Sequence, residues 1–477
     1  MRIAFATLGC RQNQFETDIM ADQARTAGFT PVPFTQPAEV YVINTCTVTE
    51  RADADSRQLV RRAIRRNPMA FVVVAGCYAQ ASPERIAAME EGVDLILGNA
   101  EKMELMRHLR GAAWDFQDLG VTPTRSGAKS REAAVTQKRP QISVGDIGAV
   151  RIFQDAPASE RPDRTRPFLK IQDGCNFGCT FCIIPAVRGP NRSLPPDQVI
   201  AEAQRLAAAG HPEVVLTGIN MGTYGWDLRP RTSLSAVLRR LLEETTVPRI
   251  RLSSLHPHEV TPEMVRFFGG SPRLCRHIHL AVQSGDDEVL RRMARSYRAR
   301  HFREVVARLH EAAPGIAIGV DVIVGFPGET DAAFEQTRRL LEELPVSYFH
   351  VFTYSRRSGT KAAGMPDQVP SKTKARRNYI LRQLGAQKFL AFKRGFLGRT
   401  LQVVVLDERD KGAGLLHGVS DNYLSILFEG PDILKGRLAE VVVQGVNPGG
   451  TLLGRVPGTQ SIPLLASRGR LPLLMGG

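Results

Sequence analysis

Residues 168–182 read FLKIQDGCNFGCTFC, a short apolar strand pattern that runs directly into three closely spaced cysteines. The apolar run predicts a buried strand, and the glycine at 174 predicts a turn after it. The whole chain has 7 cysteines in 477 residues. Three of them, Cys175, Cys179 and Cys182, therefore stand together on one predicted turn.

The spacing of these cysteines is C-x3-C-x2-C, with no histidine nearby. Four thiolates would complete the coordination of a zinc ion or an iron-sulfur cluster, whereas three leave one metal position open for another ligand. The motif therefore predicts a reactive metal centre. The alternatives are a zinc knuckle that lacks its fourth ligand, or three unrelated core thiols.

The composition is that of a folded globular protein, with 43% hydrophobic and 23% charged residues. The formal net charge of +15 predicts attraction to a polyanion such as RNA or DNA, although a basic solvated surface would give the same value. No apolar run of about 18 residues and no signal peptide is present, so we expect a cytoplasmic protein without membrane insertion. The reducing cytosol favours metal or thiol chemistry over disulfides.

Residues 1–116 alternate apolar runs with helical patterns. The runs RIAFATLG, VYVINT and AFVVVAG are typical of buried parallel strands, and helices are expected over 16–28 and 50–68. We therefore predict an α/β domain with a parallel sheet. Residues 117–160 are polar and are interpreted as a linker that holds one short strand pair around 142–153.

Two further domains follow in the sequence. Residues 161–391 contain six strand-helix units, which fit a partial (β/α)6 barrel better than an open sheet. Residues 393–458 contain alternating β runs joined by Gly, Asn and Asp turns, which predict a small antiparallel β-barrel. The tail, residues 459–477, has no assignable role.

A second set of cysteines becomes visible once the strands are assigned. Cys10, Cys46 and Cys77 each follow one of the three apolar runs of the first domain. Parallel strands end at the same edge of a sheet, and sites in such folds are built at that edge. We therefore expect these three thiols to converge, again as an incomplete set, unless they are buried and inert. Cys275 lies before a strand and is interpreted as a core residue.

The motifs resemble those of a known family. CNFGCTFC resembles the cysteine motif of radical S-adenosylmethionine (SAM) enzymes, and TLGCRQNQFET, INTCTVTERADADSRQLVRRA and VAGCYAQ resemble the amino-terminal domain of the methylthiotransferases. The terminal barrel looks like the TRAM module of the same enzymes. These sequence motifs are most similar to those of the MtaB type, which converts N6-threonylcarbamoyladenosine at position 37 of tRNA to its 2-methylthio derivative. The branches that modify isopentenyladenosine or a ribosomal-protein aspartate are less similar.

The resemblance implies two [4Fe-4S] clusters and SAM as cofactors. One cluster, on Cys175, Cys179 and Cys182, would bind SAM and generate a 5′-deoxyadenosyl radical. The other, on Cys10, Cys46 and Cys77, would hold or supply the sulfur. The implied partners are tRNA, an electron donor of the flavodoxin or ferredoxin type, and a sulfur donor. A different class of function is a non-catalytic iron-sulfur RNA-binding redox sensor.

The resemblance also assigns supporting residues. Four residues lie in motifs that contact SAM in the family: Phe181, Gln283, Gly325 and Glu329. Asn13 lies close in sequence to Cys10, in the first cysteine set (Cys10, Cys46 and Cys77). Asp321 stands where the general pattern often has glycine. Core packing or a structural hydrogen bond is the alternative for Phe181, Gln283 and Asn13.

Basic runs are candidates for RNA contact. The helix after Cys46 carries five arginines, and RRMARSYRARHFR forms a second run. Such runs usually form a solvated face, but beside an RNA-modifying site they also indicate phosphate contact. The terminal barrel is expected to help bind tRNA. The five arginines are Arg57, Arg61, Arg62, Arg65 and Arg66.

Overall fold

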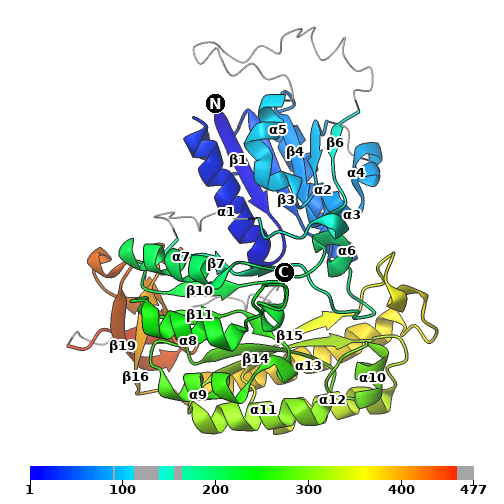
Figure 1. Cartoon of the computed structure of the whole chain (residues 1–477). Helices are drawn as coiled ribbons and strands as arrows, with labels where there is room; N and C mark the ends of the chain where they lie inside the picture. Colours follow the sequence, from blue (N-terminus) through cyan, green and yellow to red (C-terminus); the bar gives the residue numbers. More distant parts are fainter. Residues whose placement is uncertain (90–91, 112–138, 155–163, 459–477) are drawn as a thin grey trace. The chain divides into compact units, whose positions relative to one another are not determined.

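The computed structural model describes residues 1–89, 92–111, 139–154 and 164–458 (Figure 1). The chain forms two compact units. The amino-terminal unit comprises Met1–Ser159, Gly174–Phe177 and Cys182–Pro190, and the carboxy-terminal unit comprises the remainder, so the cysteine loop contributes residues to both. The predicted boundaries near 116 and 160 and the tail lie outside the described residues. Among the described helices, none has the length and apolar composition needed to cross a membrane.

The amino-terminal unit is built on a six-stranded sheet in which every pair of neighbouring strands is parallel. The predicted parallel sheet is therefore confirmed, and the three cysteine-bearing strands are adjacent at its centre. In sheet order the strands are β2 (Thr30–Val32), β1 (Arg2–Thr7), β3 (Val40–Thr45), β4 (Phe71–Gly76), β5 (Leu95–Leu97) and β6 (Gln141–Ser143).

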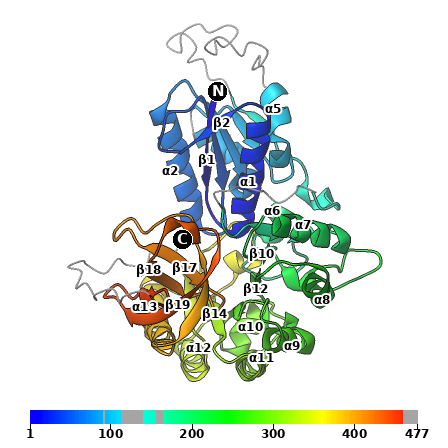
Figure 2. The same ribbon diagram turned by 90° about the vertical axis from the view of Figure 1, so that its left-hand side faces the viewer.

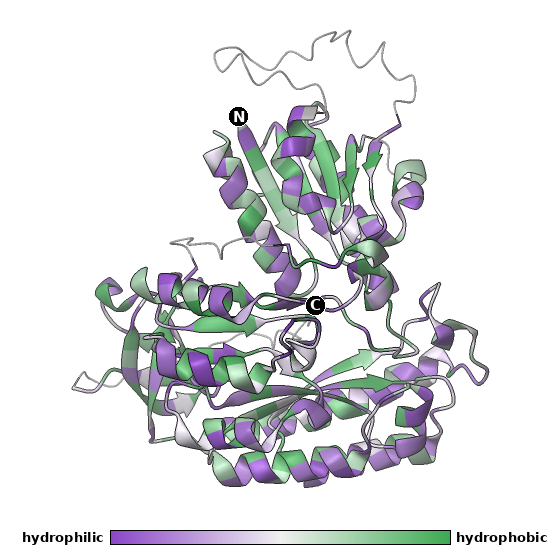
Figure 3. Cartoon of the chain, in the orientation of Figure 1, coloured by the Kyte–Doolittle hydropathy of each residue, from purple (hydrophilic) through white to green (hydrophobic). Residues whose placement is uncertain are grey.

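Helices cover both faces of this sheet (Figures 1 and 2). One face packs against α1 and α5, whose residues Met20 and Leu105 share a core with the strands. The other face packs against α2, α3 and α4, represented in the core by Val60, Tyr78 and Ile86. The apolar strands lie between amphipathic helices, as the hydropathy colouring shows (Figure 3). The helices are α1 (Arg11–Thr26), α2 (Glu50–Arg66), α3 (Cys77–Ala81), α4 (Pro83–Met89) and α5 (Leu105–Gly111).

The strand pair predicted around residues 142–153 is wrong. Strand β6 pairs in parallel with the open edge of β5, with Ile142 opposite Ile96, and a short 3-10 helix η2 (Ile147–Ala149) follows it. The open edge of an existing sheet offers more backbone hydrogen bonds than an isolated hairpin, which is marginal by itself. Residues 139–154 therefore complete the amino-terminal sheet.

The partial barrel of the carboxy-terminal unit contains the six predicted strands, all paired in parallel. One of the six apolar runs, RIRLSSL at 249–255, is interrupted at Ser253, so that its first half joins a three-stranded sheet and its second half a four-stranded sheet. The first sheet has the order β11 (Ile250–Leu252), β10 (Val214–Thr217) and β7 (Phe168–Lys170). The second has the order β12 (Ser254–Leu255), β13 (His277–Gln283), β14 (Ala317–Val324) and β15 (Tyr348–Thr353).

Helices alternate with these strands, as the sequence predicted. A short antiparallel pair, β8 (Gln172–Asp173) with β9 (Arg192–Ser193), brackets the cysteine loop. The helices are α6 (Ile184–Arg188), which belongs to the amino-terminal unit, and α7 (Pro196–Ala208), α8 (Leu234–Glu244), α9 (Pro262–Gly270), α10 (Asp287–Arg292), α11 (Ala299–Ala312), α12 (Asp331–Glu343) and α13 (Ser371–Arg394).

The terminal segment folds into a closed five-stranded barrel, which confirms the predicted small β-barrel. Its core contains Val403, Ile426, Phe428 and Val441. Neighbouring strands are antiparallel except for β18 and β20, which pair in parallel and close the barrel. In barrel order the strands are β16 (Thr400–Val405), β17 (Leu416–Ser420), β18 (Ser425–Glu429), β20 (Leu452–Arg455) and β19 (Leu438–Val446).

A buried carboxylate joins the two barrels of the carboxy-terminal unit. Glu213 accepts two hydrogen bonds from Arg251 at 2.7 and 2.9 Å, and Arg166 and Arg249 lie within 3.0 Å of it. Arg251 also donates to the backbone carbonyls of Ser420 and Asp421 in the terminal barrel at 2.9 Å. Burial alone would raise the pKa of Glu213, but the three arginines hold it far below its usual value.

Replacing Glu213 by Gln should destabilise the protein by about 3–5 kcal/mol at pH 7, because two buried guanidinium groups lose their charge partner. Since the pKa of the folded carboxyl is depressed, the wild type loses this contribution as the pH falls below about 4.3, the value for an unfolded Glu. The difference in the free energy of unfolding between wild type and Glu213→Gln should therefore be smaller at about pH 3.5 than at pH 7. Urea unfolding of both proteins at the two pH values measures this difference. Glu263→Gln, which removes an ion pair with the exposed Arg239, should cost far less. Equal losses in the two variants would contradict the account.

Candidate functional site

The first cysteine set lies at the carboxyl edge of the amino-terminal sheet. Cys46 directly follows β3, and Cys77 directly follows β4 as the first residue of α3. The register pairs Thr45 with Gly76, so these two strands end level with each other. Cys10 precedes α1, three residues after β1 ends. Cys46 and Cys77 are buried, and Cys10 is exposed.

The three thiols are electrostatic neighbours. Desolvation is the main cause that raises the pKa of Cys46 to about 12, and the neighbouring Cys77 and Cys10 contribute to the same shift. Arg188 opposes the desolvation of both Cys10 and Cys46. That the three thiols converge on one metal centre stays a prediction. A thiol as buried as that of Cys46 would fit such a centre, because a bound metal supplies the positive charge that deprotonates its thiolate ligands.

Two glycines allow the cysteine-bearing turns to approach each other. At Gly9 the backbone has a φ of +95°, and a Cβ atom there would lie 2.7 Å from Cβ and 2.8 Å from Sγ of Cys46. At Gly76 the φ is also +95°, and a Cβ atom would lie 2.4 Å from Oδ1 of Asn44. No larger side chain fits at either position without displacing its neighbours.

Asn13 connects two of these turns. Its Nδ2 donates to the carbonyl of Leu8 at 2.7 Å and to that of Thr45 at 2.9 Å. The structural alternative for Asn13 is therefore observed, and the side chain lies where it orders the backbone before Cys10 and Cys46.

Three buried charged side chains of the amino-terminal unit, Glu16, Lys102 and Arg188, form ion pairs with one another. Arg188, six residues after Cys182, donates to both carboxylate oxygens of Glu16 and to Oδ1 of Asn13. Lys102 Nζ lies 2.6 Å from Glu16 Oε2. All three charged side chains are at most 2% exposed. No sequence pattern indicates this group, because Glu16 and Arg188 are 172 residues apart and each residue type is usually solvated.

The second cysteine set lies on the loop between β8 and β9. Cys175 and Cys182 belong to the amino-terminal unit, and Cys179 belongs to the carboxy-terminal unit. The backbone N–H of Phe177 donates to Cys175 Sγ at 3.4 Å, and Arg295 donates to Cys179 Sγ at 3.4 Å. All three thiols are free and partly exposed. Hydrogen bonds to sulfur are typical of cysteines that hold iron-sulfur clusters. That the three bind one cluster stays a prediction.

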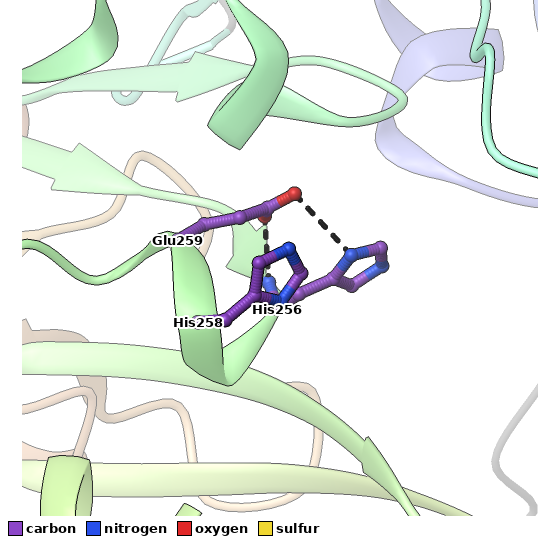
Figure 4. A group of neighbouring side chains, drawn as sticks. All are labelled: His256, His258 and Glu259. Atoms are coloured by element: carbon purple, nitrogen blue, oxygen red, sulfur yellow. Dashed lines mark hydrogen bonds and ion pairs between the residues drawn. The ribbon is translucent and has the colours of Figure 1, made fainter. Parts of the chain in front are cut away.

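Arg295 is part of a buried polar chain that sequence reasoning did not single out. It donates to Nε2 of His256 at 3.0 Å, and Nδ1 of His256 lies 3.3 Å from Glu259 (Figure 4). His258 stands beside His256, with their ring centroids 5.8 Å apart. The group of His256, His258 and Glu259 has the donor types of a metal site. The guanidinium of Arg295 already supplies the positive charge there, so the group is explained without a metal.

Phe181 and Gln283, two of the residues predicted to contact SAM, lie in the carboxy-terminal unit. Phe181 packs edge to face on Phe326, with centroids 6.3 Å apart, and Arg295 lies 5.5 Å above its ring. Gln283 is buried, with a φ of +63°. Within the described residues, its Oε1 has no hydrogen-bond donor. A buried acceptor of this kind fits a polar ligand.

The other two form a tight turn after β14. The backbone N–H of Gly325 donates to Oε2 of Glu329 at 2.6 Å, and Arg377 donates to the same oxygen at 2.6 Å. Burial raises the pKa of Glu329, and these two donors oppose the shift. At Gly325 the φ is +73°, and a Cβ atom would lie 2.3 Å from Lys374 Cγ. Glu329 therefore stabilises the turn, and its contact with SAM stays a prediction.

Asp321 pairs with two histidines from the neighbouring strands. Its Oδ1 lies 2.8 Å from Nε2 of His279 and 3.5 Å from Nδ1 of His350. Burial would raise the pKa of Asp321, but His279 and His350 hold it well below its usual range. The carboxylate of Asp321 is therefore accommodated by ion pairs with His279 and His350, so this position does not need the small size of glycine.

The five arginines of α2 divide into two groups. Arg57 lies 5.9 Å from the ring of Tyr78, and Arg66 lies 5.7 Å from the ring of Phe34, so both are partly covered. Arg61, Arg62 and Arg65 are exposed. The exposed group remains a candidate for phosphate contact.

Comparison with known proteins agrees with this architecture. Residues 2–98 match the uncharacterized protein family UPF0004, and residues 169–341 match the radical SAM superfamily. A structure of the radical SAM methyltransferase TsrM from Kitasatospora setae has a TM-score of 0.51 at 15% identity, covering 80% of this chain and 84% of that one. The fold and the cysteine loop thus define a radical SAM protein.

Curated relatives narrow the class. The chain is 37% identical to threonylcarbamoyladenosine tRNA methylthiotransferase MtaB of Bacillus subtilis, over 92% of this chain and 93% of that protein. It is also 37% identical to MtaB of Aquifex aeolicus, over 93% of this chain and 100% of that protein. A tRNA-2-methylthio-N(6)-dimethylallyladenosine synthase of Moorella thermoacetica is 34% identical, over 91% of this chain and 94% of that protein. The chain belongs to the radical SAM methylthiotransferase family.

Gly9→Ala should displace Cys46 and prevent the first cysteine set from holding its metal centre. With two four-iron clusters, the iron content of anaerobically reconstituted protein should fall from roughly eight to roughly four per chain. Gly28→Ala is the matched control, since its φ is +88° but no atom lies within 4 Å of the added Cβ. Both variants should lose about 1–2 kcal/mol from the left-handed backbone. Full iron content in Gly9→Ala would contradict the proposed site.

Proposed function

We propose that this protein is a transferase that converts N6-threonylcarbamoyladenosine at position 37 of tRNA to its 2-methylthio derivative. The proposal is carried by two groups of three cysteines in the sequence, each of which would leave one position of a four-ligand shell open. The likeness to two MtaB proteins over more than nine-tenths of the chain supports the choice of substrate.

The reaction explains why two open centres are needed. The hydrogen on carbon 2 of adenine is not acidic, so no side chain of ordinary pKa can remove it. A cluster with bound SAM supplies a carbon-centred radical for that step. In the proposal, Cys175, Cys179 and Cys182 hold this cluster, and Cys10, Cys46 and Cys77 hold the centre from which sulfur is delivered.

Residues around each cysteine set fit these assignments. Arg295 places a positive charge and an N–H donor on Cys179, which suits an anionic cluster. Gln283 offers a buried acceptor to a polar ligand such as SAM. In the amino-terminal unit, the buried cations Lys102 and Arg188 both pair with Glu16, and Asn99 connects Lys102 to the thiol of Cys77.

The proposed partners follow from the reaction and the charge. The net charge of +15, the exposed arginines of α2 and the terminal barrel support binding of tRNA phosphates. Cluster reduction requires an electron donor of the flavodoxin or ferredoxin type, and turnover requires a sulfur donor. A cytoplasmic location would give access to all of them.

Nucleoside mass spectrometry of tRNA tests the substrate. In a strain that lacks the gene, 2-methylthio-N6-threonylcarbamoyladenosine should disappear and return on complementation. If that nucleoside is unchanged and its 2-methylthio-isopentenyl counterpart is lost, the relative from Moorella thermoacetica indicates the correct substrate instead. If neither tRNA nucleoside changes, modification of a ribosomal-protein aspartate becomes the alternative.

Substitutions in the two cysteine sets should abolish different steps of the reaction. Cys179→Ala should abolish SAM cleavage under strong reductant, whereas Cys46→Ala should retain cleavage and block sulfur insertion. Cys275→Ala is the control, because this buried cysteine precedes β13 and belongs to neither set. The assay is anaerobic detection of 5′-deoxyadenosine and of methylthiolated tRNA. Absence of SAM cleavage in the folded wild type would favour the non-catalytic redox sensor.

The exposed arginines of α2 should contribute to tRNA affinity. Replacing Arg61, Arg62 and Arg65 by Gln should weaken tRNA binding and reduce the salt dependence of log Kd by up to about three counterions. The control replaces three exposed arginines that are paired with glutamates and lie outside both basic runs, Arg107, Arg239 and Arg339. Binding measured from 50 to 200 mM salt separates the two sets. Equal effects would assign the α2 arginines to a solvated face.

A further inference from the structure

The loop between β10 and α8, residues 218–233, carries an exposed aromatic side chain followed by two exposed arginines. Trp226 is 51% exposed, and Arg229 and Arg231 are also exposed. A single exposed apolar side chain is common on soluble proteins and means little by itself. The backbone around Trp226, however, is fixed by buried polar contacts.

Asp227 fixes the backbone directly after Trp226. Its carboxylate accepts a hydrogen bond from Nδ2 of Asn191 at 2.7 Å. It also accepts from the backbone N–H and from the hydroxyl of Ser193, at 2.8 and 2.6 Å. Asn191 and Ser193 are at most 6% exposed. Three donors on one carboxylate hold this point of the loop in place, because hydrogen bonds to an ionised acceptor are the strong ones.

Gly225 fixes the backbone directly before Trp226. Its N–H donates to the hydroxyl of Ser193 at 2.9 Å. At Gly225 the φ is +83°, and a Cβ atom there would lie 2.5 Å from Cγ2 of Thr232, so the two sides of the loop meet closely at this glycine. An exposed ring on a fixed backbone is already oriented for binding, so less conformational entropy is lost when a ligand packs on it.

The same polar contacts join this loop to both sides of the second cysteine set. Gln172, in β8 before the cysteines, accepts from the backbone N–H of Asn220 at 2.7 Å and donates to Oδ1 of Asn191 at 2.7 Å. The hydroxyl of Thr223 donates to the same oxygen of Asn191 at 2.7 Å. The loop also follows a parallel strand of the partial barrel, at the edge where such barrels form their sites. Trp226 is therefore presented at the edge where the substrate would enter.

We propose that Trp226, Arg229 and Arg231 form a contact surface for single-stranded RNA. Unpaired bases in RNA loops stack on aromatic side chains, and arginines contact the phosphates between them. In this assignment the indole of Trp226 stacks on a base next to the modified adenosine, and the two arginines contact neighbouring phosphates. The inference rests on the proposed function for the identity of the RNA, because it requires a tRNA base to reach the second cysteine set.

Tryptophan fluorescence tests the stacking contact in the full chain. The chain contains two tryptophans, Trp114 and Trp226, so Trp114→Phe leaves Trp226 as the single reporter. An anticodon stem-loop RNA should quench its emission on binding, because the indole stacks on an unpaired base. A fully paired RNA duplex of the same length should quench it far less at equal occupancy. Unchanged emission at saturating stem-loop RNA would overturn the inference.

Substitution of the ring gives a second measurement. Trp226→Leu keeps an apolar side chain but removes the aromatic face, and it should weaken binding of the stem-loop RNA about five- to thirtyfold. Trp226→Tyr should restore most of the affinity. Neither change should alter the salt dependence of log Kd or the binding of heparin, a polyanion without bases, because the indole carries no charge. Tyr379→Leu is the control, since Tyr379 is 65% exposed but lies on α13.

The two arginines should behave in the opposite way. Replacing Arg229 and Arg231 by Gln should reduce the salt dependence of log Kd by up to about two counterions and should weaken heparin binding. An unchanged salt dependence would overturn the assignment of the arginines to phosphates. Iron content and melting temperature equal to those of the wild type establish that each variant is folded.

Failure of the inference differs from failure of the proposed function. If the wild type modifies tRNA while Trp226→Leu binds the stem-loop RNA as tightly as the wild type, or no more weakly than Tyr379→Leu, the contact surface is wrong and the proposed function stands. If the RNA binds and quenches Trp226 but its N6-threonylcarbamoyladenosine is never modified, the proposed function is wrong and the contact surface stands.

Discussion

The parallel pairing of β1, β3 and β4 is the constraint on which the rest of the amino-terminal unit depends. Since the hydrogen-bond register makes these strands end at one edge, the residues that follow them are forced into the same neighbourhood. Cys10, Cys46 and Cys77 follow these strands, so they belong to the same edge of the sheet without any sequence motif that joins them. Gly9 and Gly76 allow the approach, because a Cβ atom at either would overlap a neighbouring side chain.

Charge is the second requirement of such a site. Thiols buried at a sheet edge ionise with difficulty, as the raised pKa of Cys46 illustrates. A metal centre on these residues would remove their protons. Lys102 and Arg188 both pair with the buried Glu16 in the same unit. The same logic applies to Cys179, where Arg295 is oriented by His256 and Glu259.

Much of this organisation was readable from the sequence. Strands β1, β3 and β4 of the amino-terminal sheet, the six strands of the partial barrel, and the terminal barrel follow from periodicity and turn residues. The expected convergence of Cys10, Cys46 and Cys77 follows from where the strands end. The family, expected from the cysteine motifs, is shown by relatives that are 37% identical over most of the chain.

Other features had no local signal. β6 joins a sheet edge formed by residues about fifty positions earlier, so its pairing depends on an edge that the sequence does not reveal. Glu16, Lys102 and Arg188 come from three distant segments and belong to residue types that are usually exposed, so no pattern predicts their burial. The arginines of α2 look alike in sequence, yet Tyr78 and Phe34 cover two of them.

The most direct test of the central claim is anomalous diffraction at the iron absorption edge from crystals of the anaerobically reconstituted full chain. The account predicts two separate iron clusters, one with iron about 2.3 Å from the sulfur atoms of Cys10, Cys46 and Cys77 and the other bound by Cys175, Cys179 and Cys182. A single iron cluster, with the thiols of Cys10, Cys46 and Cys77 bound to no metal, would contradict it.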